Sequence, residues 1–281
     1  MTTTASDVAL YYDELHRWTE RDQGFQTFSG FGHDSIHRFL IDADSGAFSP
    51  LTIYKHVDRH LPTHEPLRGL DAGCGYGGTA FRYLETHGGR WTGVTISQQQ
   101  WRCATAIAQA RGVAGAIDFH LASYDAPLPG RYNVIVGIES LIHTADPMAT
   151  VGNLAAALDP GGRLIVVDDM PVEAPPPGDA VLLDEFRRAW RCPVAPTAAA
   201  WSAAATAAGL SPIAEHDLSH LLKPRAEPDL DAALEHLTSL RAEKTRQGFG
   251  RLSDAEIGGL HLERLTRRGS MRYVMLVFER V

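Results

Sequence analysis

Short apolar runs alternate with amphipathic segments through the middle of the chain. The runs that predict buried strands are 67–73, 90–96, 115–121, 132–138 and 163–169. The segments whose apolar positions recur with helical spacing are 79–88, 97–112 and 147–158. Ser97 is expected to cap the second helix, and Gly112 to follow its end. This alternation predicts an α/β fold, in which a parallel sheet carries helices on both faces.

Other segments interrupt the alternation. Residues 1–66 read as mostly helical, and a proline-rich stretch at 170–180 leads into an amphipathic segment at 181–190. A long helical segment lies within 224–268, and 272–281 reads as a terminal strand. We expect an N-terminal helical cap at 1–66 and a main domain at 67–281. Lid insertions at about 170–195 and 224–268, together with the cap, would cover a cleft.

The composition narrows the class of protein. The chain has 281 residues, of which 44% are apolar, so disorder is not expected. It has no apolar run of membrane-spanning length, and its N-terminus lacks the pattern of a secretory signal, which predicts a cytoplasmic protein. A formal net charge of −8 without a basic stripe argues against nucleic acid as a partner. Cys74, Cys103 and Cys192 are too far apart to form a metal or disulfide framework.

The stretch LDAGCGYGG, residues 70–78, follows the first predicted strand and supplies a glycine turn. Such a turn lets a ligand approach the backbone closely. A dinucleotide site needs an acidic residue for the ribose after the next strand, but this strand continues into GVTISQQQ, residues 93–100. Asp71 lies directly before the turn, where it would repel a pyrophosphate and attract a cationic ligand.

These two motifs resemble those of class I S-adenosylmethionine (SAM)-dependent methyltransferases, and the second resembles the cyclopropane-synthase-like and prenyl-diphosphate C-methyltransferase group. The resemblance covers about Leu67 to Asp169 and implies a seven-stranded, mostly parallel Rossmann-like sheet with SAM as cofactor. It is weaker at FQTFSGF, residues 25–31, and at LASYDAP, residues 121–127.

The resemblance assigns residues to each part of the cofactor. The residues implied for the methionyl part are Asp71, Gly73 and Gly75; for the ribose, Thr95, Ile96 and Gln100; for the adenine, Tyr124 and Asp125; and for the carboxylate, Phe28 and Ser29. Plainer interpretations stay open. The glycines could form an ordinary tight turn, Gln100 could be solvated, and the last two pairs could be a turn and a helix cap.

The stretch IESLIHTADP, residues 138–147, contains the candidate catalytic residues. Glu139 ends the fourth predicted strand beside the expected cofactor, and His143 would share its face if the segment were helical. The Glu-Ser pair resembles carbon-methylating relatives, and in the prenyl-diphosphate group this glutamate is the proposed cation stabiliser and base. A salt bridge for Glu139 and a packed or capping role for His143 are the alternatives.

The candidate acceptor-binding residues are His33, His37, Arg38 and Tyr54, of which the cationic ones could meet a diphosphate. Scattered surface cations are the alternative interpretation. The leading hypothesis is C-methylation of an isoprenoid diphosphate through a carbocation that Glu139 handles. O- or N-methylation of a natural product is the second, and a dinucleotide-dependent oxidoreductase or nucleotide-binding module is the third.

No metal-ligand motif stands out, so no resident metal is expected. Mg²⁺ could accompany a diphosphate, and Asp168 and Asp169 would be its possible protein contributors. The expected partner is a small, apolar acceptor with an anionic head, and a homo-oligomer stays open.

Overall fold

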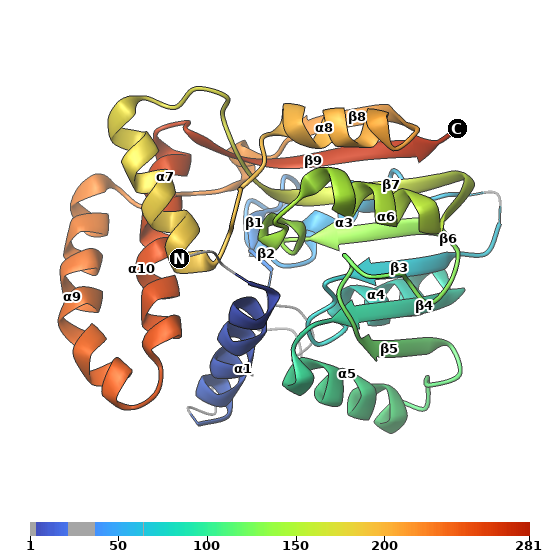
Figure 1. The fold of residues 1–281 in the computed structure, drawn as a ribbon, viewed down its shortest axis with the longest axis horizontal. Coiled ribbons are helices and arrows are strands. Elements are labelled where there is room, and N and C mark those ends of the chain that lie inside the picture. Colours follow the sequence, from blue (N-terminus) through green and yellow to red (C-terminus); the bar gives the residue numbers. More distant parts are fainter. Residues whose placement is uncertain (1–3, 22–36, 64) are drawn as a thin grey trace.

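The structure, a computed structural model, describes residues 4–21, 37–63 and 65–281. Within these ranges a seven-stranded sheet forms the centre of the molecule, with the order β5-β4-β3-β6-β7-β9-β8 (Figure 1). The strands are β3 (Arg68–Ala72), β4 (Arg90–Thr95), β5 (Ile117–Leu121), β6 (Tyr132–Ile138), β7 (Leu158–Pro171), β8 (Leu210–Asp217) and β9 (Met271–Arg280). Strands β3 to β7 pair in parallel, while β9 is antiparallel to both neighbours. The predicted mostly parallel, seven-stranded sheet is therefore confirmed.

The strand order creates a crevice between β3 and β6. After β3 the chain moves outward to β4 and β5, and it then returns to the other side of β3 to form β6. Ligands in open α/β sheets bind at this reversal, beyond the carboxyl ends of the strands. In Figure 1 the arrows of β3 and β6 point toward α1 (Ala5–Arg21) and α10 (Gly250–Arg267).

Helices cover both faces of the sheet. The helices that flank it are α3 (Thr52–Asp58), α4 (Gly78–His87), α5 (Gln98–Ala110), α6 (Pro147–Ala157) and α8 (Ala198–Ala207). Alternate residues of β6 pack into two apolar cores, one on each face of the sheet. Val134 and Val136 belong to the core with α3 and α4, and Ile135 belongs to the core with α6 and α8. Continuous apolar runs thus arise in the central strands because these strands are buried on both faces.

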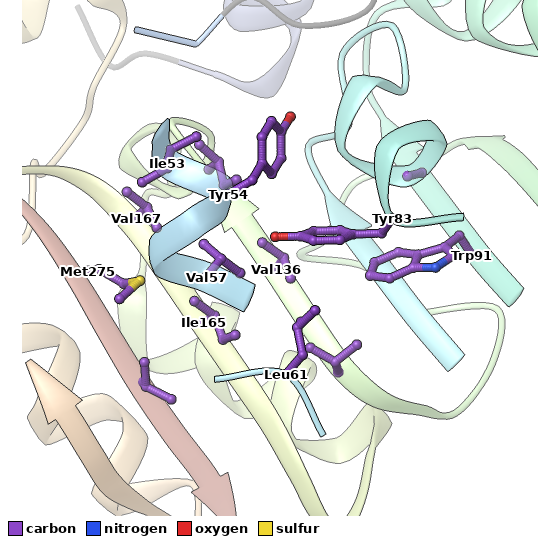
Figure 2. Packing of buried hydrophobic residues seen from close by; sticks show 14 of the residues in the cluster. Ile53, Tyr54, Val57, Leu61, Tyr83, Trp91, Val136, Ile165, Val167 and Met275 are labelled. Carbon is purple, nitrogen blue, oxygen red and sulfur yellow. The ribbon is translucent and has the colours of Figure 1, made fainter. Parts of the chain in front are cut away.

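Aromatic side chains fill the core between α3, α4 and β4. The rings of Tyr83 and Trp91 stack with centroids 5.0 Å apart, and the ring of Tyr54 meets Tyr83 edge-on at 5.6 Å (Figure 2). All three side chains are almost fully buried. This rigid cluster supports the strand that carries the glycine turn.

Several local predictions hold. Ser97 caps α5, because its side chain accepts a hydrogen bond from the backbone N–H of Gln100, and Gly112 follows the helix in the left-handed conformation. The sequence pattern predicts no element at 198–217, where α8 and β8 lie. Helix α8 is mostly alanine, which gives little hydrophobic contrast between its faces, and β8 is a half-exposed edge strand that a register shift interrupts after Pro212.

A helical group lies beyond the carboxyl ends of the parallel strands. Its members are α7 (Pro177–Trp190), α9 (Glu227–Arg246) and α10; α10 packs against the other two, and α1 contacts α5 and α10 (Figure 1). These helices lie where the lid insertions are predicted. The described part of 1–66 holds α1, α3 and a short hairpin of β1 (Leu40–Ile41) and β2 (Phe48–Ser49). No described helix is both long and apolar enough to span a bilayer.

The close packing of β3 against Trp91 can be tested with two glycine variants. A Cβ added at Gly69 would lie 2.3 Å from the Trp91 ring, whereas one added at Gly152 in α6 meets nothing within 4 Å. We expect Gly69→Ala to lower the free energy of unfolding by about 1–3 kcal/mol through overpacking. Gly152→Ala should raise it by about 0.5–1 kcal/mol through helix propensity. Denaturant titration measures both values, and similar changes in the two variants would contradict this packing.

Candidate functional site

A cavity of about 430 Å³ occupies the crevice beyond β3 and β6. The glycine turn after β3, the end of β4, and the segments after β5 and β6 form its base. Helices α1, α7 and α10 contribute side chains to the remaining wall. Elements from distant parts of the sequence thus enclose a space of the size that small-molecule sites use.

The glycine turn has a backbone that only glycine accommodates well. Gly73, Gly75 and Gly77 have φ values of 83°, 52° and 90°. A Cβ at Gly73 would also lie 2.5 Å from the Cβ of Ser140, the residue that follows Glu139. The hydroxyl of Ser140 donates to the carbonyl of Ala72 at 2.5 Å, which fixes the turn to the end of β6. The plain tight-turn interpretation does not explain why this turn lines the cavity.

Asp71 is a buried carboxyl group on the cavity wall. It is 3% exposed, and burial raises its pKa to about 7. Within the described part of the chain its Oδ2 has no hydrogen-bond partner. A buried carboxylate oxygen without a hydrogen-bond partner strongly attracts a ligand cation.

A second unsatisfied polar atom lies on the same wall. The Thr95 hydroxyl donates to Oε1 of Gln100 at 2.8 Å, which orients the amide, and Nε2 of Gln100 has no partner in the described ranges. Both residues and Ile96 line the cavity. Gln100 is 3% exposed and therefore not the solvated helix residue of the alternative interpretation.

The loop after β5 is braced against its surroundings. The hydroxyl of Tyr124 donates to the carbonyl of Ser140 at 3.0 Å, and Asn153 of α6 donates to the carbonyl of Tyr124 at 2.6 Å. Asp125 accepts a hydrogen bond from the hydroxyl of Thr150. Tyr124 and Asp125 both line the cavity, so the braced loop is positioned to hold a planar group there.

Glu139 has a strained backbone and a firmly held carboxylate. Its φ of 51° lies in the left-handed region, which costs a non-glycine residue about 1–3 kcal/mol. Its Oε1 accepts hydrogen bonds from the backbone N–H of Arg38 at 2.9 Å and the hydroxyl of Tyr273 at 2.8 Å. Among the described residues Oε2 accepts none, so one oxygen is anchored and the other is available to a ligand in the cavity.

His143 is a buried, neutral imidazole on the same wall. Burial lowers its pKa to about 4. Its Nδ1 lies 3.3 Å from the carbonyl of Arg191, which assigns the proton to Nδ1, and Nε2 then accepts from the Tyr12 hydroxyl at 2.9 Å. Glu139 and His143 do not share a helical face, because Glu139 precedes a single 3₁₀ turn, η1 (Leu141–His143). Both still line one cavity.

The remaining predicted residues are placed differently. His37 lines the cavity, and its Nε2 lies 3.1 Å from the Tyr54 hydroxyl. Tyr54 itself is buried in the core under α4 and is not on the cavity wall. The Arg38 guanidinium pairs with Asp169 behind the wall, and only its backbone reaches Glu139. Phe28, Ser29 and His33 lie outside the described residues.

The hydrogen bonds and the ion pair of Asp168 and Asp169 are made to the protein itself, and Oδ1 of Asp169 has no partner among the described residues. Asp168 accepts the backbone N–H groups of Ile142 at 2.9 Å and of Asp169 at 3.0 Å. Burial raises the pKa of Asp168 well above its usual value and that of Asp169 to about 6, despite the Arg38 cation beside Asp169. Across the described ranges, no group of three or more metal-ligating side chains is arranged to hold an ion.

Comparison with known proteins identifies the family. A methyltransferase-domain model matches residues 70–164. An O-methyltransferase of Aspergillus nomiae, rstn1, is 30% identical over 59% of this chain and 72% of its own length. The chain belongs to the class I SAM-dependent methyltransferases.

Other relatives and structures have the same domain. The O-methyltransferase resE of Aspergillus sclerotiorum is 29% identical over 59% of this methyltransferase and 61% of its own length. The 27-O-demethylrifamycin SV methyltransferase of Amycolatopsis mediterranei is 29% identical over 79% and 85%. The structure of the cyclopropane synthase MmaA2 from Mycobacterium tuberculosis matches all of this chain and 99% of its own, with 17% identity and a TM-score of 0.76.

A geranyl diphosphate C-methyltransferase structure from Streptomyces coelicolor also matches, over 96% of this chain and 98% of its own, with 17% identity and a TM-score of 0.66. At such identities the likeness concerns the fold. It confirms the Rossmann-like methyltransferase architecture.

The cavity fits the cofactor of this family. SAM carries an ammonium group, for which the unsatisfied Oδ2 of Asp71 is a suitable acceptor, and Gln100 Nε2 is a donor suited to its ribose or adenine. Gly73, Gly75, Thr95, Ile96, Tyr124 and Asp125 complete the same wall. Bound SAM would supply a methyl group activated by the positive sulfonium.

Some residues of the site could not be found from the sequence. Tyr273 reaches Glu139 from β9, at a separation of 134 residues, and sits inside an apolar run that reads as plain core. Asp13 of α1 accepts from the Ser97 hydroxyl at 2.6 Å, and Glu14 accepts from the backbone N–H of Leu252 at 2.8 Å. Helix α1 is therefore hydrogen-bonded both to the start of α5 and to the start of α10 beside the cavity. No local sequence pattern predicts these contacts.

The ionisation of Asp71 predicts the pH dependence of cofactor binding. In the free protein its pKa is about 7, and pairing with a ligand ammonium lowers it, so binding below pH 7 must release a proton. We expect the affinity for S-adenosylhomocysteine to fall by roughly tenfold per pH unit as the pH drops below about 7. Calorimetry in buffers of different ionisation enthalpy measures affinity and proton release together.

Asp71→Asn is the matched control for this linkage. The variant should bind S-adenosylhomocysteine more weakly, with little pH dependence from pH 5.5 to 7 and little proton release. If wild-type affinity were equally flat over that range, Asp71 would not be the group that pairs with the cofactor.

Proposed function

We propose that this methyltransferase transfers a methyl group from SAM to an oxygen atom of a small molecule whose methyl-accepting part is apolar and uncharged, with Glu139 as the general base. One observation carries the proposal. The described part of the cavity wall contains four carboxyl groups, on Asp71, Asp125, Glu139 and Glu256, and no lysine or arginine; of the four, Glu256 is paired with Lys244 from outside the wall. A neutral acceptor enters such a wall at little electrostatic cost, whereas a diphosphate would be repelled.

The wall opposite the cofactor residues suits a flat, apolar acceptor. Tyr11, Tyr12 and Leu15 from α1 face this part of the cavity, with Trp190 from α7 and Leu252 from α10. Aromatic side chains at such positions offer large contact areas and stacking geometry. The named relatives support this choice, because several are O-methyltransferases, and one acts on 27-O-demethylrifamycin SV.

The geometry of Glu139 suits proton removal. As the acceptor oxygen attacks the methyl carbon and the carbon–sulfur bond breaks, the hydroxyl proton would pass to Oε2 of Glu139. Hydrogen bonds from Arg38 and Tyr273 to Oε1 keep the carboxylate in place throughout. Burial and the neighbouring Glu139 charge raise the pKa of Tyr273 well above its usual value, so this hydroxyl stays a donor. Displacement at a methyl group then requires mainly orientation and the exclusion of water.

His143 is better suited to orientation than to proton removal. With a pKa of about 4, it is a weak base at neutral pH. Its hydrogen bond with Tyr12 instead fixes an aromatic hydroxyl of α1 at the cavity wall.

C-methylation of an isoprenoid diphosphate is the second candidate. The anchored Glu139 carboxylate and the aromatic wall of Tyr11, Tyr12 and Trp190 could stabilise a carbocation. The diphosphate would have to be held with Mg²⁺ or by residues beyond the cavity wall, since His37 is the one candidate acceptor residue described on it. N-methylation of a natural product needs the same apolar wall and less help from a base.

An acceptor panel separates these candidates. Purified protein is incubated with SAM labelled in its methyl group and with simple phenols, aromatic amines, and prenyl diphosphates with and without Mg²⁺. We expect label in uncharged phenols. Label found exclusively in the prenyl diphosphates would overturn the proposal in favour of C-methylation.

The role of Glu139 predicts a separation of binding from turnover. Glu139→Gln should keep its affinity for S-adenosylhomocysteine within about twofold and lose about 10²- to 10⁴-fold in kcat, the range for a lost general base. Glu235→Gln, an exposed glutamate on α9, is the control and should match the wild type. A Glu139→Gln enzyme with near-normal kcat would remove Glu139 from the mechanism.

A further inference from the structure

A second cavity of about 300 Å³ adjoins the first. It is formed by the segment around the β1–β2 hairpin, the residues after η2 (Ser219–Leu221), the end of α7 and one side of α10. Trp190 and Gly259 line both cavities. The two spaces therefore share a wall that includes the indole of Trp190.

In this shared wall, two glycines of α10 face the indole of Trp190. The Trp190 Nε1 donates to the carbonyl of Ala255 at 2.8 Å, which holds the ring against α10. A Cβ at Gly258 would lie 2.8 Å from the ring, and one at Gly259 would lie 3.9 Å from its far edge. Two adjacent glycines thus let the ring lie directly on the helix.

The two cavities differ in charge. The first has carboxyl groups and no lysine or arginine on its described wall, whereas the second has Lys223 and Arg38. Within the described ranges Lys223 has no ion-pair partner, and Arg38 is paired with Asp169. The acid of the second cavity, Glu263, is neutralised by Arg225. The second cavity is thus cationic, with an apolar lining that includes Phe39 and Leu222.

We propose that the acceptor extends past Trp190 into the second cavity and ends there in an oxyanion that Lys223 binds, with Arg38 beside it. This inference rests on the proposed function and adds to it a substrate class: an elongated molecule with a neutral methyl-accepting end, an apolar middle and an anionic far end. Gly259 and Trp190 line both cavities, so the acceptor would pass from one to the other between them. Lys223 provides the charge that the first cavity lacks.

A series of 4-hydroxyphenyl alkanoic acids of increasing chain length is a suitable probe, because each has a phenol at one end and a carboxylate at the other. Each acid is compared with its uncharged methyl ester by calorimetry on protein saturated with S-adenosylhomocysteine. We expect one range of lengths in which the acid binds about 10- to 100-fold more tightly than its ester, as for a hydrogen bond to a charged group.

Lys223→Met should bring the ratio of the binding affinities of acid and ester close to one at that length. Arg102→Met, which removes an exposed cation from α5, is the charge-matched control and should leave the ratio unchanged. Acids and esters that bind equally at every length, or a preference that survives Lys223→Met, would overturn the inference.

Gly259→Leu tests the passage separately. The added side chain should weaken the binding of the acids that reach Lys223 by at least about tenfold relative to the binding of the shortest acid. This is the loss of affinity expected for one blocked contact. Gly259→Ala, whose Cβ meets the indole at an ordinary 3.9 Å, is its control. Equal weakening of all lengths would contradict a passage at this point. If simple phenols are methylated in the acceptor panel while the acids show no preference, the further inference alone fails.

Discussion

The site depends on a carboxyl group buried without a protein cation to balance it. Asp71 lies at the end of β3, and the glycine turn that follows is packed so closely on Ser140 that no side chain fits between. The shift of its pKa from 3.8 to about 7 corresponds to a free-energy cost on the order of 4 kcal/mol when the group is charged. Below about pH 4 this carboxyl is protonated in both folded and unfolded chains and costs nothing, and the cost grows as the pH rises to about 7. The protein tolerates an ionised group that a cationic ligand can neutralise.

A second constraint fixes the reactive end of the cavity. Glu139 occupies a left-handed conformation at the end of β6, beside the glycine turn, and two donors hold one of its carboxylate oxygens. Behind it, Arg38 pairs with Asp169, so the cation that could have neutralised Glu139 is engaged elsewhere. The carboxylates of Asp71 and Glu139 thus stay available for a sulfonium cofactor and for an acceptor proton. The cation of the second cavity that has no ion-pair partner in the described ranges is Lys223.

The sequence predicts the frame of this protein better than the details of its site. Strand and helix alternation indicates the sheet because the central strands are buried on both faces, and Ser97 is visible as a cap because its hydrogen bond is local. The place of Asp71 in the site can be predicted because this residue directly precedes the glycine turn in the chain. By contrast, the register of β9 brings Tyr273 to Glu139, and the burial of Tyr54 depends on its contact with Tyr83. Neither contact has a local sequence pattern, and the pairing of Arg38 with Asp169 spans 131 residues.

The most direct test of the central constraint is the coupling between Asp71 and the ligand ammonium. Affinities for S-adenosylhomocysteine and for its analogue without the amino group would be measured by calorimetry on wild type and on Asp71→Asn at pH 8. Removal of the amino group should weaken binding to the wild type by about tenfold or more and should change binding to the variant little, a coupling of at least about 1.4 kcal/mol. Equal losses in both proteins would show that the buried carboxylate does not recognise the ammonium.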